Sequence, residues 1–213
     1  MEMNPKLKNG LEWAYCIIIA IVLALLFRYY IGTPTVVKQP SMYNTLEDGQ
    51  RLLLSRWTRT VNGKYERGDI ITFEAPSITN VKQGEIDMNN PVAIYNYQPT
   101  GIASFVYNIL ELNKMSYIKR VIGVENDHIQ IKDGAVYVNE NKLPEEYLQD
   151  GVVTDANKGI FTDLIVPENC VFALGDNRTR STDSRNFGCI PIEKIEGKVI
   201  VRFWPLNLFG KVE

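Results

Sequence analysis

The chain has 213 residues, with 25 Asp or Glu, 23 Lys or Arg and a formal net charge of −2. This length suits one sizeable domain with small additions, and the balanced charge lacks the basic field of nucleic-acid-binding domains, so we expect no nucleic-acid partner. The three cysteines have no metal-ligand spacing and His128 is the single histidine, which argues against a zinc site or any other metal site.

The first predicted element is an apolar helix near the amino terminus. Residues 13–27 read WAYCIIIAIVLALLF and are followed by the aromatic pair Tyr29-Tyr30. With its flanks the run approaches the roughly 20 residues that a membrane-spanning helix needs. A cleavable signal peptide is the alternative, but the run is long for one and no small-x-small site follows it closely. Lys6 and Lys8 favour a cytoplasmic amino terminus, which would put the rest of the chain outside the cytoplasm.

Beyond the anchor, short apolar runs alternate with turn residues. The runs typical of strands are 52–54, 69–73, 171–174 and 198–203, and 129–138 is typical of a hairpin with Asp133-Gly134 at its tip. Asn62-Gly63 predicts a turn between the first two strands. Strands without alternating helices predict a mostly β fold, an antiparallel sheet or barrel, behind one amino-terminal transmembrane helix.

Residues 101–113 differ from this pattern of short strands because their apolar positions recur at helical spacing. The pattern favours an amphipathic helix that covers one face of the sheet. A helix lying in the membrane surface is the alternative, since its other face is polar but hardly charged.

A lysine interrupts the apolar strand predicted over residues 117–123. Side chains alternate along a strand, so Tyr117, Lys119 and Val121 share one face. A lysine buried without a carboxylate partner has a lowered pKa, and a neutral amine is a general base. The alternative is a lysine that reaches water from a strand edge.

Four separated segments together resemble the type I signal peptidases, membrane-anchored serine proteases of peptidase family S26 with a Ser/Lys dyad. They are 39–46 (a serine box), 67–73 (a Gly-Asp-Ile strand), 117–127 (a lysine box) and 175–188, which contains every fixed position of GDNRxxSxDSRxFG. The segments occur in family order, and the resemblance extends from the anchor to Trp204-Pro205.

The resemblance implies site residues one by one. Ser41 is the implied nucleophile and Lys119 its general base, the Ser/Lys variant of triad logic. Ser181 matches a serine that hydrogen-bonds the lysine, and Asp183 and Arg185 match a structural ion pair that supports the loop.

The backbone N–H of Ser41 is the expected oxyanion donor. Where some relatives have a serine as second donor this chain has Gln39, whose side-chain amide is a candidate for that role. Where many have Pro, this chain has Asn44, which is expected to loosen the turn. An insertion of about 40 residues, at 77–114, separates the Gly-Asp-Ile strand from the lysine box.

The expected organisation follows from these segments. Residues 1–10 form a cytoplasmic amino terminus and 11–31 the anchor. Residues 32–123 and 171–213 form a catalytic β-domain, and 124–170 a small cap region that contains the hairpin. The resemblance implies a single-pass protein of the plasma membrane, with its catalytic domain on the extracytoplasmic side. It would act as a monomer without a cofactor on signal peptides of secretory precursors, bound in extended form, and cleave after small residues.

Three other readings remain. Phe203 to Leu206 either dips into the membrane interface or packs in the core. Cys170 and Cys189 flank the polar loop and would face an oxidising compartment, where a disulfide between them is an alternative to free thiols. A Ser-His-Asp enzyme would have to use His128, next to Asp127, but no Gly-x-Ser-x-Gly context exists.

Two further functions compete with precursor processing. A self-cleaving regulatory protease would share the Ser/Lys chemistry, but such proteins usually carry a DNA-binding domain. A catalytically silent anchored β-domain that binds exported proteins would not need Ser41 or Lys119.

Overall fold

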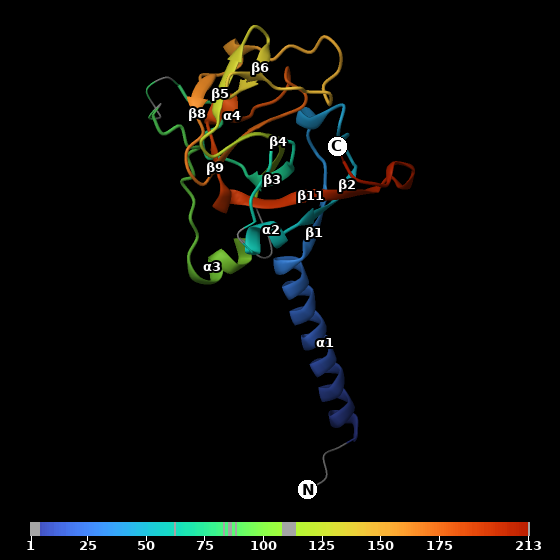
Figure 1. Cartoon of the computed structure of the whole chain (residues 1–213). Coiled ribbons are helices and arrows are strands. Elements are labelled where there is room, and N and C mark those ends of the chain that lie inside the picture. Colours follow the sequence, from blue (N-terminus) through green and yellow to red (C-terminus); the bar gives the residue numbers. More distant parts are fainter. Residues whose placement is uncertain are drawn as a thin grey trace.

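A long helix leaves one end of a β-rich body in the computed structural model, which describes residues 5–61, 63–82, 84, 87, 89–107 and 114–212 (Figure 1). The helix α1 runs from Pro5 to Tyr30. Its segment Lys8–Tyr30 has a mean hydropathy of 2.3 and none of it is buried against the body. It is the one helix in the described ranges that is long and apolar enough to cross a membrane.

The larger of two antiparallel sheets has seven strands in the order β1-β2-β11-β3-β4-β9-β10. Their bounds are Gly32–Val36 (β1), Arg51–Ser55 (β2), Ile70–Glu74 (β3), Ser116–Val124 (β4), Cys170–Leu174 (β9), Ile190–Pro191 (β10) and Ile195–Trp204 (β11). The mostly β, antiparallel fold predicted from the sequence is therefore confirmed.

The carboxyl-terminal strand β11 lies between β2 and β3 and corrects one sequence expectation. It pairs with β2 on one side, through Val199 and Leu54, and with β3 on the other, through Lys198 and Ile71. β2 and β3 are consequently not neighbours joined by a hairpin, although each strand forms close to where it was predicted. Of the predicted turn, Asn62 lies outside the described residues. The turn residues between β2 and β3 carry no information about β11, which begins about 140 residues after the end of β2.

The smaller sheet has four strands in the order β7-β6-β5-β8. Their bounds are His128–Lys132 (β5), Ala135–Val138 (β6), Asn141–Lys142 (β7) and Asp163–Ile165 (β8). The predicted hairpin is β5–β6, and positive φ at both Asp133 (53°) and Gly134 (74°) fits its two-residue turn. All four strands come from the range 124–170.

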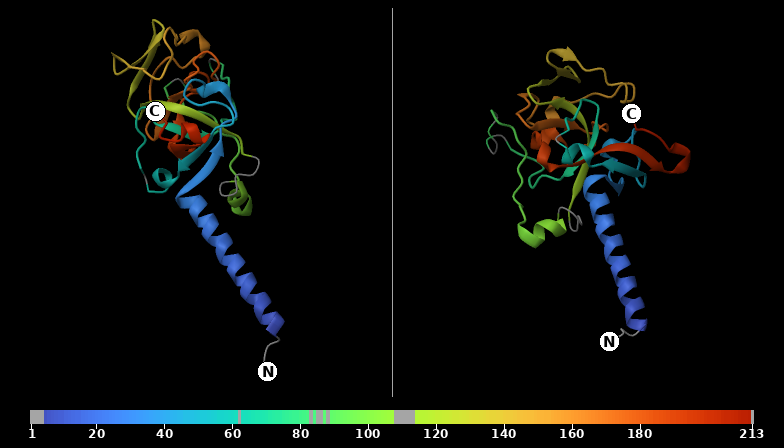
Figure 2. Two further views of the ribbon diagram at one scale, coloured as in Figure 1. Left: turned by 90° about the vertical axis from the view of Figure 1, so that its right-hand side faces the viewer. Right: turned by 60° about the horizontal axis from the view of Figure 1, so that its bottom comes forward.

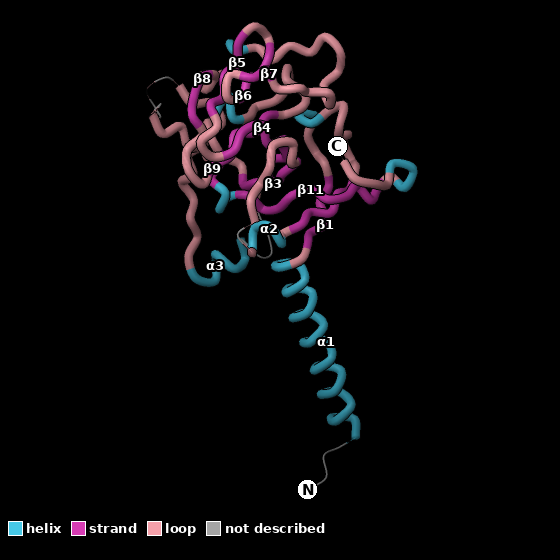
Figure 3. The backbone as a smooth tube through the Cα atoms, viewed as in Figure 1, coloured by secondary structure: helices cyan, strands magenta, loops and turns pink. Residues whose placement is uncertain are grey.

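Helices other than α1 are short (Figure 3). Their bounds are Trp57–Thr60 (α2), Gly101–Phe105 (α3) and Ser184–Phe187 (α4), with 3-10 turns at Pro40–Met42 (η1), Ala156–Lys158 (η3), Ile192–Lys194 (η4) and Leu206–Leu208 (η5). Helix α3 begins the segment predicted to be amphipathic, of which residues 108–113 lie outside the described residues. The views agree that α3 lies at the end of the body from which α1 leaves (Figures 1 and 2).

The lysine strand β4 runs through the centre of the larger sheet, between β3 and β9. Apolar side chains on both of its faces enter buried clusters: Val121 packs in one of them and Ile122 in another. Ile118 packs against a third cluster, which contains Met42 from the serine segment. This position explains how a residue at 119 is withdrawn from water.

Candidate active site

Ser41 lies in a short, well-defined turn. It is the second residue of η1, which Pro40 opens with its fixed φ, and its residue is 6% exposed. The first hydrogen bond that closes the turn runs from Tyr43 N to Pro40 O at 3.1 Å. The N–H of Ser41 precedes that bond and is left unused by the turn, as at any helix start.

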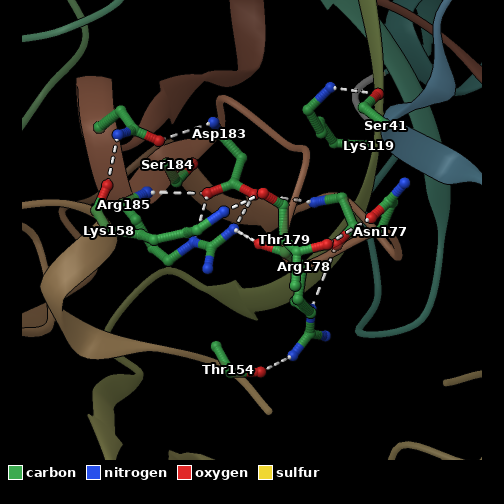
Figure 4. Close-up of polar contacts among 12 residues, drawn as sticks. Ser41, Lys119, Thr154, Lys158, Asn177, Arg178, Thr179, Asp183, Ser184 and Arg185 are labelled. Carbon is green, nitrogen blue, oxygen red and sulfur yellow. Dashed lines mark hydrogen bonds and ion pairs between the residues drawn. The ribbon is translucent and has the colours of Figure 1, made fainter. Parts of the chain in front are cut away.

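Lys119 points from β4 at this serine (Figure 4). Its Nζ lies 2.8 Å from Ser41 Oγ and donates to Ile118 O at 3.0 Å, while the residue is 1% exposed. The Tyr117 ring, two residues back on the same face, covers the amine with its centroid 5.1 Å from Nζ. The predicted alternation along the strand is thus confirmed at Tyr117 and Lys119.

Burial lowers the pKa of the Lys119 amine to about 8. Asp183 and Asp176 act in the opposite direction, but desolvation is the larger effect. Each of these carboxylates is held by an arginine: Arg185 for Asp183 and Arg120 for Asp176. The lysine therefore has a hydroxyl, not a carboxylate, as its side-chain partner.

The ion pair between Asp183 and Arg185 is bidentate and fully buried. Arg185 Nε donates to Asp183 Oδ1 and Arg185 Nη2 to Asp183 Oδ2, both at 2.8 Å, and both residues are 0% exposed. Asp183 also forms the capping box of α4 with Asn186 and accepts the N–H of Gly175 at 3.1 Å. Burial opposes ionisation, but Arg185, together with Ser181 and the N–H of Gly175, outweighs it and holds the pKa of Asp183 below its ordinary value.

The polar loop 175–188 is tied directly to the serine turn. Asn177 N donates to Ser41 O at 3.0 Å, Asn177 Nδ2 donates to Pro40 O at 3.1 Å, and Thr45 Oγ1 donates to Asp176 Oδ2 at 2.6 Å. A Cβ on Gly175 would lie 2.5 Å from Ser41 O and 2.3 Å from Ser181 Oγ. Only glycine allows this approach, so the loop and the serine turn form one unit.

Ser181 is close to this unit but does not bond the lysine. Its Oγ is buried and has no hydrogen-bond partner among the described residues. It faces Asp183 closely enough to help keep the pKa of that carboxyl low, without the geometry of a full hydrogen bond. The expected contact between Ser181 and Lys119 is thus not formed in this structure.

The two departures at the serine segment have different outcomes. Gln39 is exposed and lines the groove beside Ser41. Asn44 has φ of 90°, which proline cannot adopt, and Leu46 N closes the turn onto Met42 O at 2.8 Å. The turn is therefore not loosened by Asn44.

Two buried ion pairs of the loop 175–188 were not predicted from the sequence. Arg120 makes three hydrogen bonds of 2.8–3.3 Å to Asp176. Arg178, which is 1% exposed, pairs with Glu145 from the small-sheet region. The fixed arginine of the loop pattern was the available signal for the second pair, but nothing in the sequence identified its partner.

Among the described residues, His128 does not contact Ser41, and Cys170 and Cys189 do not form a disulfide. Both ring nitrogens of His128 face carboxylates, Glu140 at 3.0 Å and Asp163 at 2.7 Å, at the start of the inner strand β5 of the small sheet. Cys170 and Cys189 are buried free thiols in one apolar cluster.

A groove of about 860 Å³ leads from Ser41 to the upper end of α1. Its walls are the edge strand β1 and the start of β4, and Ala24 and Phe27 of α1 close its far end. The buried pair Lys114–Glu196, with Nζ 3.0 Å from Oε1, also lines it. Because β1 is an edge strand, its unpaired backbone groups can bind an extended peptide.

Comparison with known proteins gives one family. The family model described as "Signal peptidase, peptidase S26" matches residues 10–204. Signal peptidase I of Bacillus licheniformis is 34% identical over 100% of this chain and 98% of its own length. Signal peptidase I T of Bacillus subtilis (strain 168) is 32% identical over 96% and 90% respectively. A solved signal peptidase I of Enterococcus faecalis V583 is 25% identical, covers 63% of this chain and 96% of that chain, and has a TM-score of 0.41.

Proposed function

The chain belongs to the S26 family of signal peptidases and is a serine peptidase that removes signal peptides from secretory precursors, and from this premise we propose that Ser41 and Lys119 form its catalytic dyad. The observation that carries the proposal is the 2.8 Å separation of Lys119 Nζ and Ser41 Oγ, with the amine almost fully buried. An amine with its pKa lowered to about 8 is neutral in a useful fraction of molecules near pH 7.

The neutral amine accepts the proton of Ser41 Oγ as that oxygen attacks the carbonyl carbon of the scissile bond. The N–H of Ser41 donates to the oxyanion that forms, and the exposed amide of Gln39 is a second donor. Lys119 then gives the proton to the leaving amine, and the signal peptide remains as an ester on Ser41. Lys119 next deprotonates a water that hydrolyses this ester, which regenerates the hydroxyl.

Residues of the loop keep these groups in place. Asp183 and Arg185 fix the loop that holds Ser41 O through Asn177. Ser181 Oγ, which is buried and forms no full hydrogen bond with the described residues, is available to orient the lysine when the amine carries the transferred proton.

The groove between β1 and β4 accepts the end of the signal peptide in extended form, with small residues at the cleavage position and two residues before it. Helix α1 anchors the enzyme in the plasma membrane, with residues 1–10 cytoplasmic and the catalytic domain outside. Anchoring enzyme and precursor to one bilayer raises their effective concentration. The enzyme acts as a monomer, with residues 32–123 and 171–213 as the catalytic domain and 124–170 as a cap.

A precursor-processing assay with reconstituted full-length enzyme tests the dyad. Ser41→Ala and Lys119→Ala should each abolish cleavage, while His128→Ala and the matched exposed-lysine control Lys132→Ala cleave like the wild type. Cleavage retained by Ser41→Ala or Lys119→Ala would refute the dyad and favour a silent binding domain or another base.

A further inference from the structure

A second depression lies on the other side of the serine turn from the groove. Its volume is about 490 Å³. Pro40, Tyr43 and Asn44 form one wall, the loop residues 176–180 form a second, and Gln149 and Val152 complete it. The groove and the depression therefore meet at the turn that carries Ser41.

The two hollows extend in opposite directions from that turn. The groove reaches Ala24 and Phe27 of α1. The depression reaches residues 149–152, in the gold loop at the end of the body away from α1 (Figure 1). A peptide that passes Ser41 with its membrane-linked part in the groove would leave across the depression.

The charge in the depression is uneven. Asp176 is 1% exposed and held by Arg120, and Arg178 is 1% exposed and held by Glu145, so neither offers a free charge. Arg180 is exposed, and no ion pair of its guanidinium is found within the described ranges. The hollow therefore presents one available positive charge.

We propose that this depression binds the first residues of the mature protein, after the scissile bond, and that Arg180 makes the enzyme prefer a carboxylate to an ammonium group there. This proposal rests on the proposed function, because Ser41 fixes where the two parts of the substrate separate. At about 3.3 Å per extended residue, three residues span about 10 Å, which is about the diameter of a sphere with the volume of this depression. Arg180 acts as a specificity-determining residue and takes no part in the chemistry.

The test uses two precursors that share one signal peptide and differ only in Glu or Lys at the third mature position. The readout is the ratio of their kcat/KM values with the full-length enzyme in detergent micelles. The wild type should favour Glu about two- to fivefold, the range of an exposed ion pair, and the ratio should approach one in high salt. Arg180→Ala should bring the ratio close to one, and Arg180→Glu should reverse it. Lys142→Glu, on exposed β7, makes the same change in net charge and should keep the wild-type ratio.

An unchanged ratio in Arg180→Ala and Arg180→Glu would overturn the proposal, as would a wild-type ratio of one at low salt. Ser41→Ala is assayed on both precursors in parallel. If Ser41→Ala still cleaves the precursors, the proposed function fails. If Ser41→Ala is inactive but the kcat/KM ratio does not change in the Arg180 variants, only the role proposed for the depression fails.

Discussion

The pH dependence of cleavage follows from the burial of Lys119. The pKa of its amine is lowered from 10.5 to about 8, and the neutral form is the active one. Activity should therefore rise with pH through about 8 and level off above it. Below pH 8, kcat/KM should increase about tenfold for each pH unit, the slope of one titrating group.

The magnitude can be worked out from the same values. At pH 7 an amine of pKa about 8 is neutral in about 10% of molecules, while one of pKa 10.5 is neutral in about 0.03%. Burial thus supplies about 300-fold more of the active form, which corresponds to about 3 kcal/mol. Because the folded pKa is the lowered one, the cost to stability is absent above about pH 10.5 and complete below about pH 8.

The assay measures kcat/KM for one precursor from pH 6 to 10, together with unfolding of Lys119→Met at pH 7. This variant should be inactive and up to about 3 kcal/mol more stable than the wild type, since it removes the buried amine but keeps an apolar chain. Lys132→Met, on the exposed hairpin, is the control for both readouts. A profile with its midpoint below pH 7, or one unaltered in Lys119→Met, would refute the reasoning.

Three further predictions concern the loop that holds the dyad. Asp183→Asn leaves the Arg185 guanidinium buried without its charge partner and should lower the free energy of unfolding by about 3–5 kcal/mol in urea titrations. Ser181→Ala removes a hydroxyl that forms no full hydrogen bond with the described residues, so stability should change by less than about 1 kcal/mol, while kcat should fall because this hydroxyl orients the charged lysine. Gly175→Ala places a methyl group 2.5 Å from Ser41 O and should cost about 1–3 kcal/mol and most of kcat.

The exposed pair of His128 and Asp163 provides the matched control for the buried one. Asp163→Asn should cost less than about 1 kcal/mol, since this pair is largely solvated. Equal losses for Asp163→Asn and Asp183→Asn would contradict the role given to burial. Wild-type kcat in Ser181→Ala would show that this serine does not orient Lys119. Full activity of Gly175→Ala would show that the serine turn can shift to accommodate the added methyl group.

The sequence was most informative where local rules decide structure. The apolar run of α1, the Asp133-Gly134 hairpin and the strand around Lys119 all follow from hydrophobic pattern and turn chemistry, so they could be predicted. The boxes around Ser41 and 175–188 were found by resemblance, and the structure brings both into contact.

Such local rules do not predict which strands or charged side chains pair when they are far apart in the sequence. No local pattern places β11 between β2 and β3, because an antiparallel partner is chosen by register and packing across the whole chain. The partner of Arg178 is likewise a glutamate about 30 residues away, in a segment that reads as an ordinary polar loop. The free Ser181 hydroxyl depends on atomic packing that residue type does not encode.

The late arrival of β11 has a consequence for biosynthesis. Helix α1 is made before both sheets, whereas the loop that holds Ser41 and the strand β11 follow after residue 174. A growing polypeptide already carries its nucleophile and its amine, but it lacks the hydrogen bonds from Asn177 that fix the serine turn and the strand that joins β2 to β3. The newly made protease should therefore be inactive and should gain peptidase activity only when β11 has paired with β2 and β3.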